Sequence, residues 1–464
     1  MMAERQASDP TDQLQLNDGS RIAVMGGGPA GSFFAYFLLD MAQRVGTKLQ
    51  VDIYEPRNFS QKGPKSCNMC GGIVSETLVQ TLAAEGINLP PEVVERGIDG
   101  YVMHTSVGRA EIETPLHEKR IAAVYRGAGP AALPGTHGSF DGFLLELARE
   151  HGARVRPFPV RSVRWKAGRP EVHTREESPG TYDLLVVATG VNTSALHGLG
   201  PLGTEYAPPR TVKTAIREFH LGAERLATSL GTAMHVYLID IPWLQFAAII
   251  PKGETASMCL LGDHVDASLV DAFLSSPQVA ETMPDDWKRT DSICQCAPRM
   301  NIRAARKPYA DRVVFVGDAG VSRLYKDGIG AAYKTAKTAA RTALFEGISA
   351  QAFDRHYKPA CRALERDNRI GRFVFRVAGV FQHWPFATRV MLQMVRSERT
   401  QPGSERHMCT ALWDMFTGSA PYREILLRTL RPVFLWRLMW SAVRVVFTPS
   451  RASGRVAKPA QEGA

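Results

Sequence analysis

Three glycines with fixed spacing are the clearest chemical signature in this sequence. The strand-like residues 21–25 lead into Gly26-x-Gly28-x-x-Gly31, and an apolar helical pattern follows over 33–42. Glycine allows a tight turn and lets the backbone approach a pyrophosphate, while the helix N-terminus offers free N–H groups and a partial positive charge. The motif therefore predicts a dinucleotide site whose first residues are Gly26, Gly28, Pro29, Ala30 and Gly31.

An acidic residue ends the next strand-like segment. Residues 51–55 read V-D-I-Y-E, so Glu55 directly follows an apolar strand. A carboxylate at this place accepts the hydrogen bonds of an adenosine ribose. A GxGxxG motif alone is a weak signal, but the strand, the glycines, the helix, the second strand and the terminal acid together predict a dinucleotide-binding fold.

Two further segments indicate that the dinucleotide is FAD. Residues 182–190 read Y-D-L-L-V-V-A-T-G, and residues 312–318 read R-V-V-F-V-G-D before a helical run that begins at Gly328. In this order, the segments resemble the FAD-dependent oxidoreductases related to p-hydroxybenzoate hydroxylase. The resemblance implies that Asp318 binds the ribityl chain and that the following helix N-terminus faces the flavin. It adds as FAD-binding residues Gly190, Gly317, Asp318, Gly328, Ile329, Gly330 and Ala331. An NAD-only Rossmann domain would explain the first motif but not these two.

A cysteine-containing segment narrows the resemblance to one family among these oxidoreductases. Residues 65–75 read K-S-C-N-M-C-G-G-I-V-S, which is similar to the C-G-G segment of the geranylgeranyl reductase family. In that family the glycines bring the backbone close to the flavin and a cysteine lines the substrate end. The resemblance therefore implies catalytic-site roles for Cys70, Gly71 and Gly72. Residues 250–253, I-P-K-G, resemble the end of the family's F-P-K-G strand, but the aromatic residues expected just before the proline are missing.

Other interpretations of the cysteines stay open. Cys67 and Cys70 with Cys294 and Cys296 could supply four thiolates to zinc or to an iron–sulfur cluster, although C-x-C is a poor zinc half-site, and we expect no metal. A redox-active pair beside the flavin is a second interpretation, with a spacing that departs from the disulfide reductases. In a third, Cys67 only fills space and the glycines alone matter.

The order of the motifs predicts an α/β fold with a discontinuous, Rossmann-like FAD-binding domain. Its three segments are 20–79, 139–196 and 302–347. Within it, Ser139 is expected to cap a helix that runs to Glu150.

Three apolar runs between residues 233 and 261, separated by turn residues, predict an inserted antiparallel sheet that forms a substrate domain. The segments of this domain are 80–138 and 197–301. Residues 348–464 are predicted to form a C-terminal helical region, which faces a membrane in our interpretation. Breaks in it are expected at Pro385, Pro402, Pro421 and Pro432.

Composition excludes several classes of protein. The chain of 464 residues is 44% hydrophobic and 22% charged, as expected of a folded protein with two or three domains. It has no apolar run of roughly 18 residues that would span a bilayer. Seven cysteines without a secretory signal indicate reduced thiols in a cytoplasm. The net charge of +10 is uneven: from Arg423 onward there are eight Lys/Arg and two Glu. Because no nucleic-acid motif accompanies this charge, a membrane surface is the better partner.

The last predicted helix supports that interpretation. Residues 432–447 are apolar except for a narrow stripe formed by Arg437, Ser441 and Arg444. At about 1.5 Å per residue the helix reaches about 24 Å, short of a hydrocarbon core of about 30 Å. We predict that it lies in the membrane interface with its arginines toward lipid phosphates, with a core helix or a dimer contact as the alternative. The expected location is cytoplasmic and peripheral on the membrane.

These features predict an FAD-dependent reductase that saturates carbon–carbon double bonds of a prenyl or other apolar lipid chain. The alternative is an FAD-dependent monooxygenase, a hydroxylase or epoxidase of an apolar substrate, because one fold serves both reactions. The sequence holds no second dinucleotide motif that would identify the electron donor, so electrons come from NAD(P)H or a reduced carrier protein. Candidates for the proton donor, by position only, are His235, Tyr237, Tyr325 and Lys326.

Overall fold

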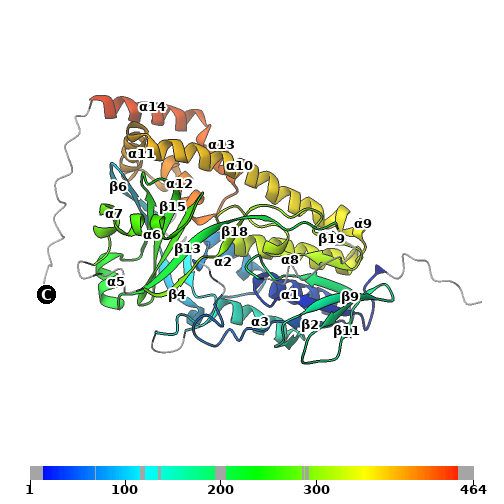
Figure 1. Cartoon of the computed structure of the whole chain (residues 1–464). Coiled ribbons are helices and arrows are strands. Elements are labelled where there is room, and N and C mark those ends of the chain that lie inside the picture. Colours follow the sequence, from blue (N-terminus) through cyan, green and yellow to red (C-terminus); the bar gives the residue numbers. More distant parts are fainter. Residues whose placement is uncertain are drawn as a thin grey trace, which may run out of the picture.

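The architecture was established from a computed structural model of the chain. It describes residues 14–67, 69, 71–114, 121–133, 137–193, 205–284, 287 and 292–447. Within these ranges two large sheets and a C-terminal group of helices make up most of the molecule (Figure 1).

The first large sheet has six strands in the order β19-β20-β12-β1-β2-β8. Its strands are β1 (Arg21–Met25), β2 (Gln50–Tyr54), β8 (Arg154–Arg156), β12 (Leu184–Val187), β19 (Tyr309–Ala310) and β20 (Val313–Phe315). All neighbours are parallel except β19 and β20. The central strands are nearly continuous runs of buried apolar residues, as expected of parallel strands covered on both faces.

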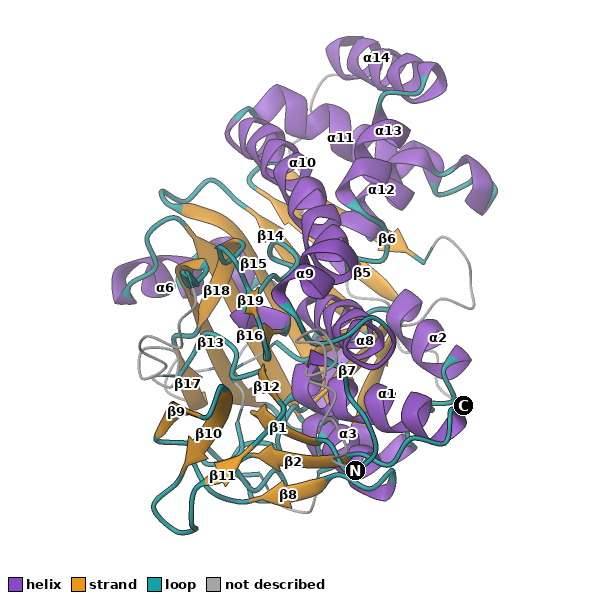
Figure 2. Ribbon diagram, turned by 90° about the vertical axis from the view of Figure 1, so that its right-hand side faces the viewer, coloured by secondary structure: helices purple, strands orange, loops and turns teal. Residues whose placement is uncertain are grey.

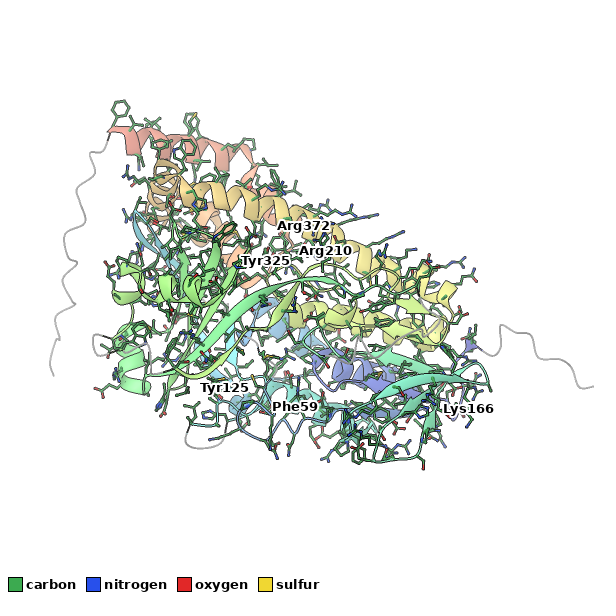
Figure 3. All side chains as sticks on the ribbon, viewed as in Figure 1. Phe59, Tyr125, Lys166, Arg210, Tyr325 and Arg372 are labelled. Atoms are coloured by element: carbon green, nitrogen blue, oxygen red, sulfur yellow. The ribbon has the colours of Figure 1, made fainter. Side chains whose placement is uncertain are left out.

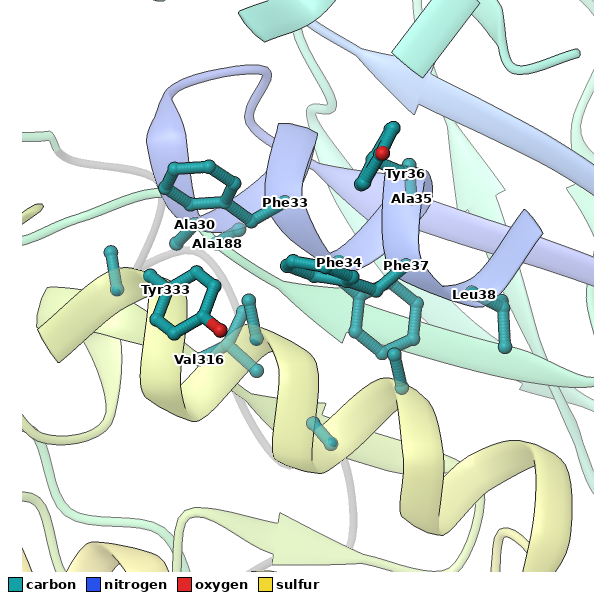
Figure 4. Close-up of a cluster of buried hydrophobic side chains, with 14 of the residues drawn as sticks. Ala30, Phe33, Phe34, Ala35, Tyr36, Phe37, Leu38, Ala188, Val316 and Tyr333 are labelled. Atoms are coloured by element: carbon teal, nitrogen blue, oxygen red, sulfur yellow. The ribbon is translucent and has the colours of Figure 1, made fainter. Parts of the chain in front are cut away.

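Helices α1 (Pro29–Arg44), α3 (Phe140–Glu150) and α8 (Gly328–Phe345) belong to this part of the chain. Figure 4 shows α1 packed on α8, where the rings of Phe33 and Phe37 meet Tyr333 edge-on at centroid distances of 5.8 and 5.5 Å. The predicted cap of α3 is confirmed, because Gly142 N donates to Ser139 Oγ at 3.0 Å. A small three-stranded sheet lies beside this part; its strands are β9 (Ser162–Lys166), β10 (Arg169–His173) and β11 (Gly180–Thr181).

The second large sheet has eight strands and is inserted into the first part along the chain. Its strands are β5 (Gly100–Thr105), β6 (Gly108–Glu113), β13 (Arg210–His220), β14 (Ala233–Leu238), β15 (Leu244–Lys252), β16 (Thr255–Gly262), β17 (Ser292–Cys296) and β18 (Arg299–Arg303). The three apolar runs predicted from the sequence are β14, β15 and β16, which pair antiparallel. Helices on one face are α5 (Ala223–Ser229), α6 (Ala267–Leu274) and α7 (Pro277–Ala280).

The segments that connect the two large sheets along the chain form a short sheet and a helix. The sheet has the order β3-β7-β4, with β3 (Ile73–Val74), β4 (Val94–Ile98) and β7 (Ile121–Val124). Strand β3 directly follows the Cys-Gly-Gly segment, and Val124 N donates to Gly72 O at 2.8 Å. Helix α2 (Glu76–Ala84) and the short turn η2 (Pro91–Val93) complete this connection.

The C-terminal helices begin on the first part, where the turns up to Tyr357 pack on α8 and β19, and continue over the other face of the second sheet. They are α9 (Ala350–Ala352), the π-helical turn η5 (Phe353–Tyr357), α10 (Lys358–His383), α11 (Pro385–Glu398), η6 (Gly403–Glu405), α12 (His407–Thr417), α13 (Tyr422–Thr429) and α14 (Pro432–Phe447). The long α10 leads from α9 to the group formed by α11 to α14 (Figures 1 and 2). As predicted, prolines mark the breaks, since α11 and α14 each begin at a proline.

These helices share a core with the second sheet. Tyr101 of β5 meets Trp413 of α12 at a centroid distance of 5.0 Å, and Phe246 of β15 stacks on Phe416 at 5.9 Å. The helical region and the second sheet therefore form one hydrophobic core. In the described part of the chain, no helix is both long and apolar enough to cross a bilayer.

Candidate active site

The carboxyl ends of the parallel strands bring the predicted FAD residues together. The register pairs Met25 with Tyr54 on one side and with Val187 on the other, and Val187 with Phe315. Gly26, Glu55, Gly190 and Gly317 follow these strand ends within a few residues. Ligands of open α/β sheets bind at this edge, where the strand order reverses.

The first glycine motif forms a close turn. Gly26 has φ +101°, and a Cβ built on it would lie 2.7 Å from Ala188 O. A Cβ on Gly31 would lie 1.9 Å from Gly26 O, so the turn and the start of α1 cannot accommodate side chains at either position. Helix α1 has no side-chain cap at Gly28, and its first-turn N–H groups therefore face the cavity that Gly28, Pro29 and Ala30 line. This geometry suits a pyrophosphate.

Glu55 lies at the next strand end with its carboxylate held in place. Gly27 N donates to Oε2 and Arg57 N donates to Oε1, both at 2.9 Å. Burial raises the pKa of Glu55, and the two backbone donors oppose this shift. A carboxylate has about four lone-pair sites, so Glu55 retains acceptor capacity toward the cavity it lines. These residues fit the adenosine end of FAD.

The second fingerprint places Asp318 on the turn η4 (Gly317–Ala319), directly after β20. Burial raises the pKa of Asp318, while a hydrogen bond with Ser322 and the charge of Arg126 oppose this shift. Arg126 is itself fixed, because its Nε and Nη2 donate to the two oxygens of Asp141 at 2.8 and 2.7 Å. Asp318 and Arg126 both line the cavity, which fits a polar chain such as ribityl.

The start of α8 is built by a capping aspartate. Asp327 has φ +50° and its Oδ1 accepts from Gly330 N at 3.1 Å. A Cβ on Gly330 would lie 2.4 Å from that oxygen, so glycine is needed there for the cap. Gly328 and Ile329 line the cavity, whereas Gly330 and Ala331 are buried.

The Cys-Gly-Gly segment lies where the FAD side meets the second sheet. Gly71 and Gly72 line the cavity, while Cys70 lies outside the described residues. A Cβ on Gly71 would lie 2.8 Å from Cys259 Sγ, and one on Gly72, at φ +70°, would lie 1.9 Å from Val124 O. The segment therefore brings bare backbone against β16 and β7.

Two further cysteines of this region, Cys67 and Cys294, interact electrostatically. The charge of Cys67 adds to burial in raising the pKa of Cys294, and Cys67 Sγ accepts from Met69 N at 3.2 Å. Within the described ranges, no group of three or more His, Cys, Asp and Glu side chains could hold a metal ion.

A predominantly apolar pocket continues from the FAD side into the second sheet. The apolar pocket and the space lined by the predicted FAD residues belong to one cavity of about 300 Å³. Phe246, Ala248 and Ile250 alternate along β15 and all line it, as the two-residue period of a strand requires. Its other apolar lining residues include Met69, Ile73, Ala215, Ile216, Met234, Cys259, Leu261, Met300, Tyr325 and Phe416.

The strand ending I-P-K-G supports this pocket from behind. Lys252 is 1% exposed, its Nζ lies 3.5 Å from Glu218 Oε1 and 5.0 Å from the Tyr125 ring centroid. Ala248 and Ile250 stand at cavity-lining positions just before the proline, where the resemblance to geranylgeranyl reductases led us to expect aromatic residues. The aromatic ring of this wall comes from Phe246 instead.

Of the four proton-donor candidates, two are buried away from the cavity and two line it. His235 is buried with its Nδ1 2.9 Å from His104 Nε2, and burial lowers its pKa to about 4. Tyr237 packs edge-on to Phe273 within the core under α6. Tyr325 and Lys326 line the cavity, and Figure 3 shows Tyr325 below the C-terminal helices.

Some wall residues were missed by the sequence analysis. Arg126 and Cys259 had no motif around them, and Phe416 lies in a helix that the sequence placed at a membrane. The alternation of Phe246, Ala248 and Ile250 was a usable signal, since residues of period two share one face of a strand.

Comparisons with known proteins agree with this geometry. No protein-family model matches the chain. A geranylgeranyl bacteriochlorophyll reductase-like protein from Thermoplasma acidophilum has a similar structure, with a TM-score of 0.61 at 15% identity over 92% of this chain and 100% of that one. The halogenase PltM, in complex with phloroglucinol and FAD, gives a TM-score of 0.57 at 13% identity over 92% and 91% of the two chains.

A curated relative adds a match in sequence. Kynurenine 3-monooxygenase from Salinispora arenicola is 26% identical over 351 residues, which are 68% of this chain and 70% of that protein. The chain is an FAD-dependent oxidoreductase by fold and by fingerprint. Within that superfamily a shared fold does not select one reaction, so the substrate must be argued from the pocket.

Proposed function

We propose that this FAD-dependent oxidoreductase saturates carbon–carbon double bonds in a prenyl or other apolar chain. The observation that carries the proposal is the single cavity, in which the FAD-binding strand ends open into a pocket walled by β14, β15, β16 and α12. When bound, FAD supplies the electrons for the reaction. The electrons originate from NAD(P)H or a reduced carrier protein.

The chain's own residues position the substrate and exclude water. Met234, Phe246, Ile250 and Phe416 give the pocket apolar walls, which suit a hydrocarbon chain. Gly71 and Gly72 keep the backbone close to the seam between the two halves of the cavity, where a Cβ would meet Cys259 or Val124. An isolated alkene is unactivated, so close placement in a dry site supplies much of the catalysis.

The experiment is anaerobic turnover. Holoprotein reduced by dithionite is mixed with prenyl alcohols and prenyl carboxylic acids, and flavin reoxidation is followed by absorbance. We expect reoxidation without oxygen, coupled to saturation of the chain. Reoxidation that occurs only when oxygen is admitted, with oxygen inserted into the substrate, would instead support a monooxygenase, the reaction named for the 26% identical relative.

We also propose that the enzyme binds a membrane surface through α14, with a revised orientation. The prediction that Arg437 faces lipid phosphates was wrong: its Nη2 contacts Glu405 Oε2 at 3.0 Å, and Ser441 is buried. Arg437 and Ser441 therefore face the protein and the apolar side faces outward, whereas Arg444 is exposed, with its guanidinium 5.6 Å from the ring centroid of Trp440. The exposed side chains of this outer face are Val433, Leu435, Trp436, Met439, Trp440, Val443, Val446 and Phe447.

Amphipathic tryptophans on an exposed apolar helix are typical of interfacial binding. The test is flotation with anionic vesicles of Trp436→Ser/Trp440→Ser protein, which should lose binding while FAD stays bound. Trp165→Ser, on the exposed strand β9, is the control and should float like the wild type. If the wild type, the double tryptophan variant and Trp165→Ser floated equally, this face would be excluded as the membrane-binding surface. Deleting residues 423–464 is unsuitable, because Ile425 and Phe434 are buried in the core.

A further inference from the structure

A lysine of the loop before α8 projects into the apolar part of the cavity. Lys326 Nζ lies 3.8 Å from the ring centroid of Phe246 and 5.7 Å from that of Phe416. The loop lies between η4 and α8, next to the second FAD fingerprint. Within the described part of the chain, no hydrogen bond or ion pair joins Nζ to an acceptor. An aromatic face compensates only in part for the hydration that an ammonium loses on burial.

Two other cations of the cavity wall, Arg126 and Arg323, are bound to protein acceptors. Arg126 forms its two-point contact with Asp141. The guanidinium of Arg323 donates to the carbonyls of Gly418 and Ala420. Lys326 thus differs from both, because its charge is directed at the pocket and not at a protein acceptor.

The backbone around Lys326 is strained and held in place from several sides. Tyr325 and Asp327, on either side of it, have φ +59° and +50°. Leu324 N donates to Asn368 Oδ1 at 2.9 Å, and Tyr422 OH donates to Leu324 O at 2.5 Å. Strained residues persist only where their surroundings over-determine them, and they gather at functional sites. The helices α10 and α13 therefore hold the conformation that presents Lys326.

We propose that Lys326 binds an anionic oxygen, a carboxylate or an acidic hydroxyl, carried by an otherwise apolar substrate. This inference rests on the proposed function and narrows its substrate class to acidic amphiphiles. The apolar walls would hold the chain, while the ammonium would donate a charge-assisted hydrogen bond to the anionic oxygen of the substrate. Specificity would follow, since a neutral ligand would leave the ammonium unpaired.

Charge at this site responds to pH. Burial lowers the pKa of Lys326 from 10.5 to about 7, and Cys259 opposes this shift. The other titratable groups of the loop that line the cavity are Arg323, Tyr325 and Asp327. A bound anion stabilises the ammonium and so raises the pKa of Lys326. The preference for an acid should therefore fall as the pH rises from about 7, the pKa of Lys326 in the free protein, toward its higher pKa in the complex.

Binding to oxidised holoprotein tests the inference without turnover. Calorimetry compares farnesoic acid with farnesol, which share one chain, at pH 6.5. The wild type should bind the acid at least about tenfold more tightly, and Lys326→Met should abolish this preference while it still binds the alcohol. Lys326→Arg should keep part of the preference. Lys334→Met, an exposed lysine of α8, is the matched control and should behave like the wild type.

Three results would overturn the inference. The first is equal affinity of the wild type for acid and alcohol, and the second is an acid preference that survives in Lys326→Met. A change of flavin potential in Lys326→Met with no change in acid binding would assign the lysine to the cofactor and also overturn it. Because these measurements need no reduction of substrate, they are independent of the anaerobic assay. Flavin content and circular dichroism confirm that each variant is folded.

Discussion

Gly72→Ala is the substitution whose effect the structure defines most fully. Gly72 has φ +70°, and an added Cβ would lie 1.9 Å from Val124 O and 3.0 Å from Lys252 Nζ. The left-handed conformation costs an L-residue about 1–2 kcal/mol, and overpacking against a backbone carbonyl adds about 1–3 kcal/mol. We therefore expect the free energy of unfolding to fall by about 2–5 kcal/mol.

Gly86→Ala is the matched control. Gly86 has φ +81°, but its added Cβ would meet nothing within 4 Å, so only the conformational cost of about 1–2 kcal/mol applies. Urea unfolding of the holoproteins, followed by circular dichroism and flavin fluorescence, measures the free energy of unfolding of both variants. The Gly72 variant should also lose turnover, because the added Cβ pushes the Cys-Gly-Gly segment away from β7. Equal losses of stability at both positions would refute the close approach at Gly72.

Three further predictions concern the cofactor, the loop and its support. Gly28→Val should abolish FAD binding, measured as flavin per chain after gel filtration, because a branched side chain would occupy the pyrophosphate position. Lys326→Met should stabilise the protein most below pH 7, where the folded wild type must bury a charged ammonium. Between pH 7 and 10.5 Lys326 is protonated in the unfolded wild type but not in the folded one, so the stability gained by the variant should fade across this range in urea titrations. Arg323→Met should lower the free energy of unfolding by about 2–5 kcal/mol, because the carbonyls of Gly418 and Ala420 lose their donor; an unchanged urea midpoint would contradict the support assigned to it.

Local motifs made the FAD side predictable from the sequence. Gly26 and Glu55 directly follow parallel strands, Asp318 stands three residues after another, and strand pairing alone brings such ends to one edge. The antiparallel insertion was equally visible, since its apolar runs between turn residues match β14, β15 and β16.

The pocket wall was not predictable, because it depends on contacts between distant segments. Phe416 reaches the cavity only because α12 packs on the second sheet, and Lys326 is presented only because α10 and α13 hold its loop. The periodicity of residues 432–447 predicted the helix correctly but not its orientation. A polar stripe that faces solvent and one that faces the protein have the same spacing. The ion pair of Arg437 with Glu405 and the burial of Ser441 show that this part of the stripe faces the protein.

The most direct test of the proposed reaction is the fate of oxygen. Holoprotein, an electron donor and a prenyl carboxylic acid are incubated under isotopically labelled oxygen, and the product is analysed by mass spectrometry. Double-bond reduction predicts a product that has gained two hydrogens and carries no label, and that forms equally well without oxygen. A product that contains labelled oxygen and requires it would contradict the reductase and establish a monooxygenase.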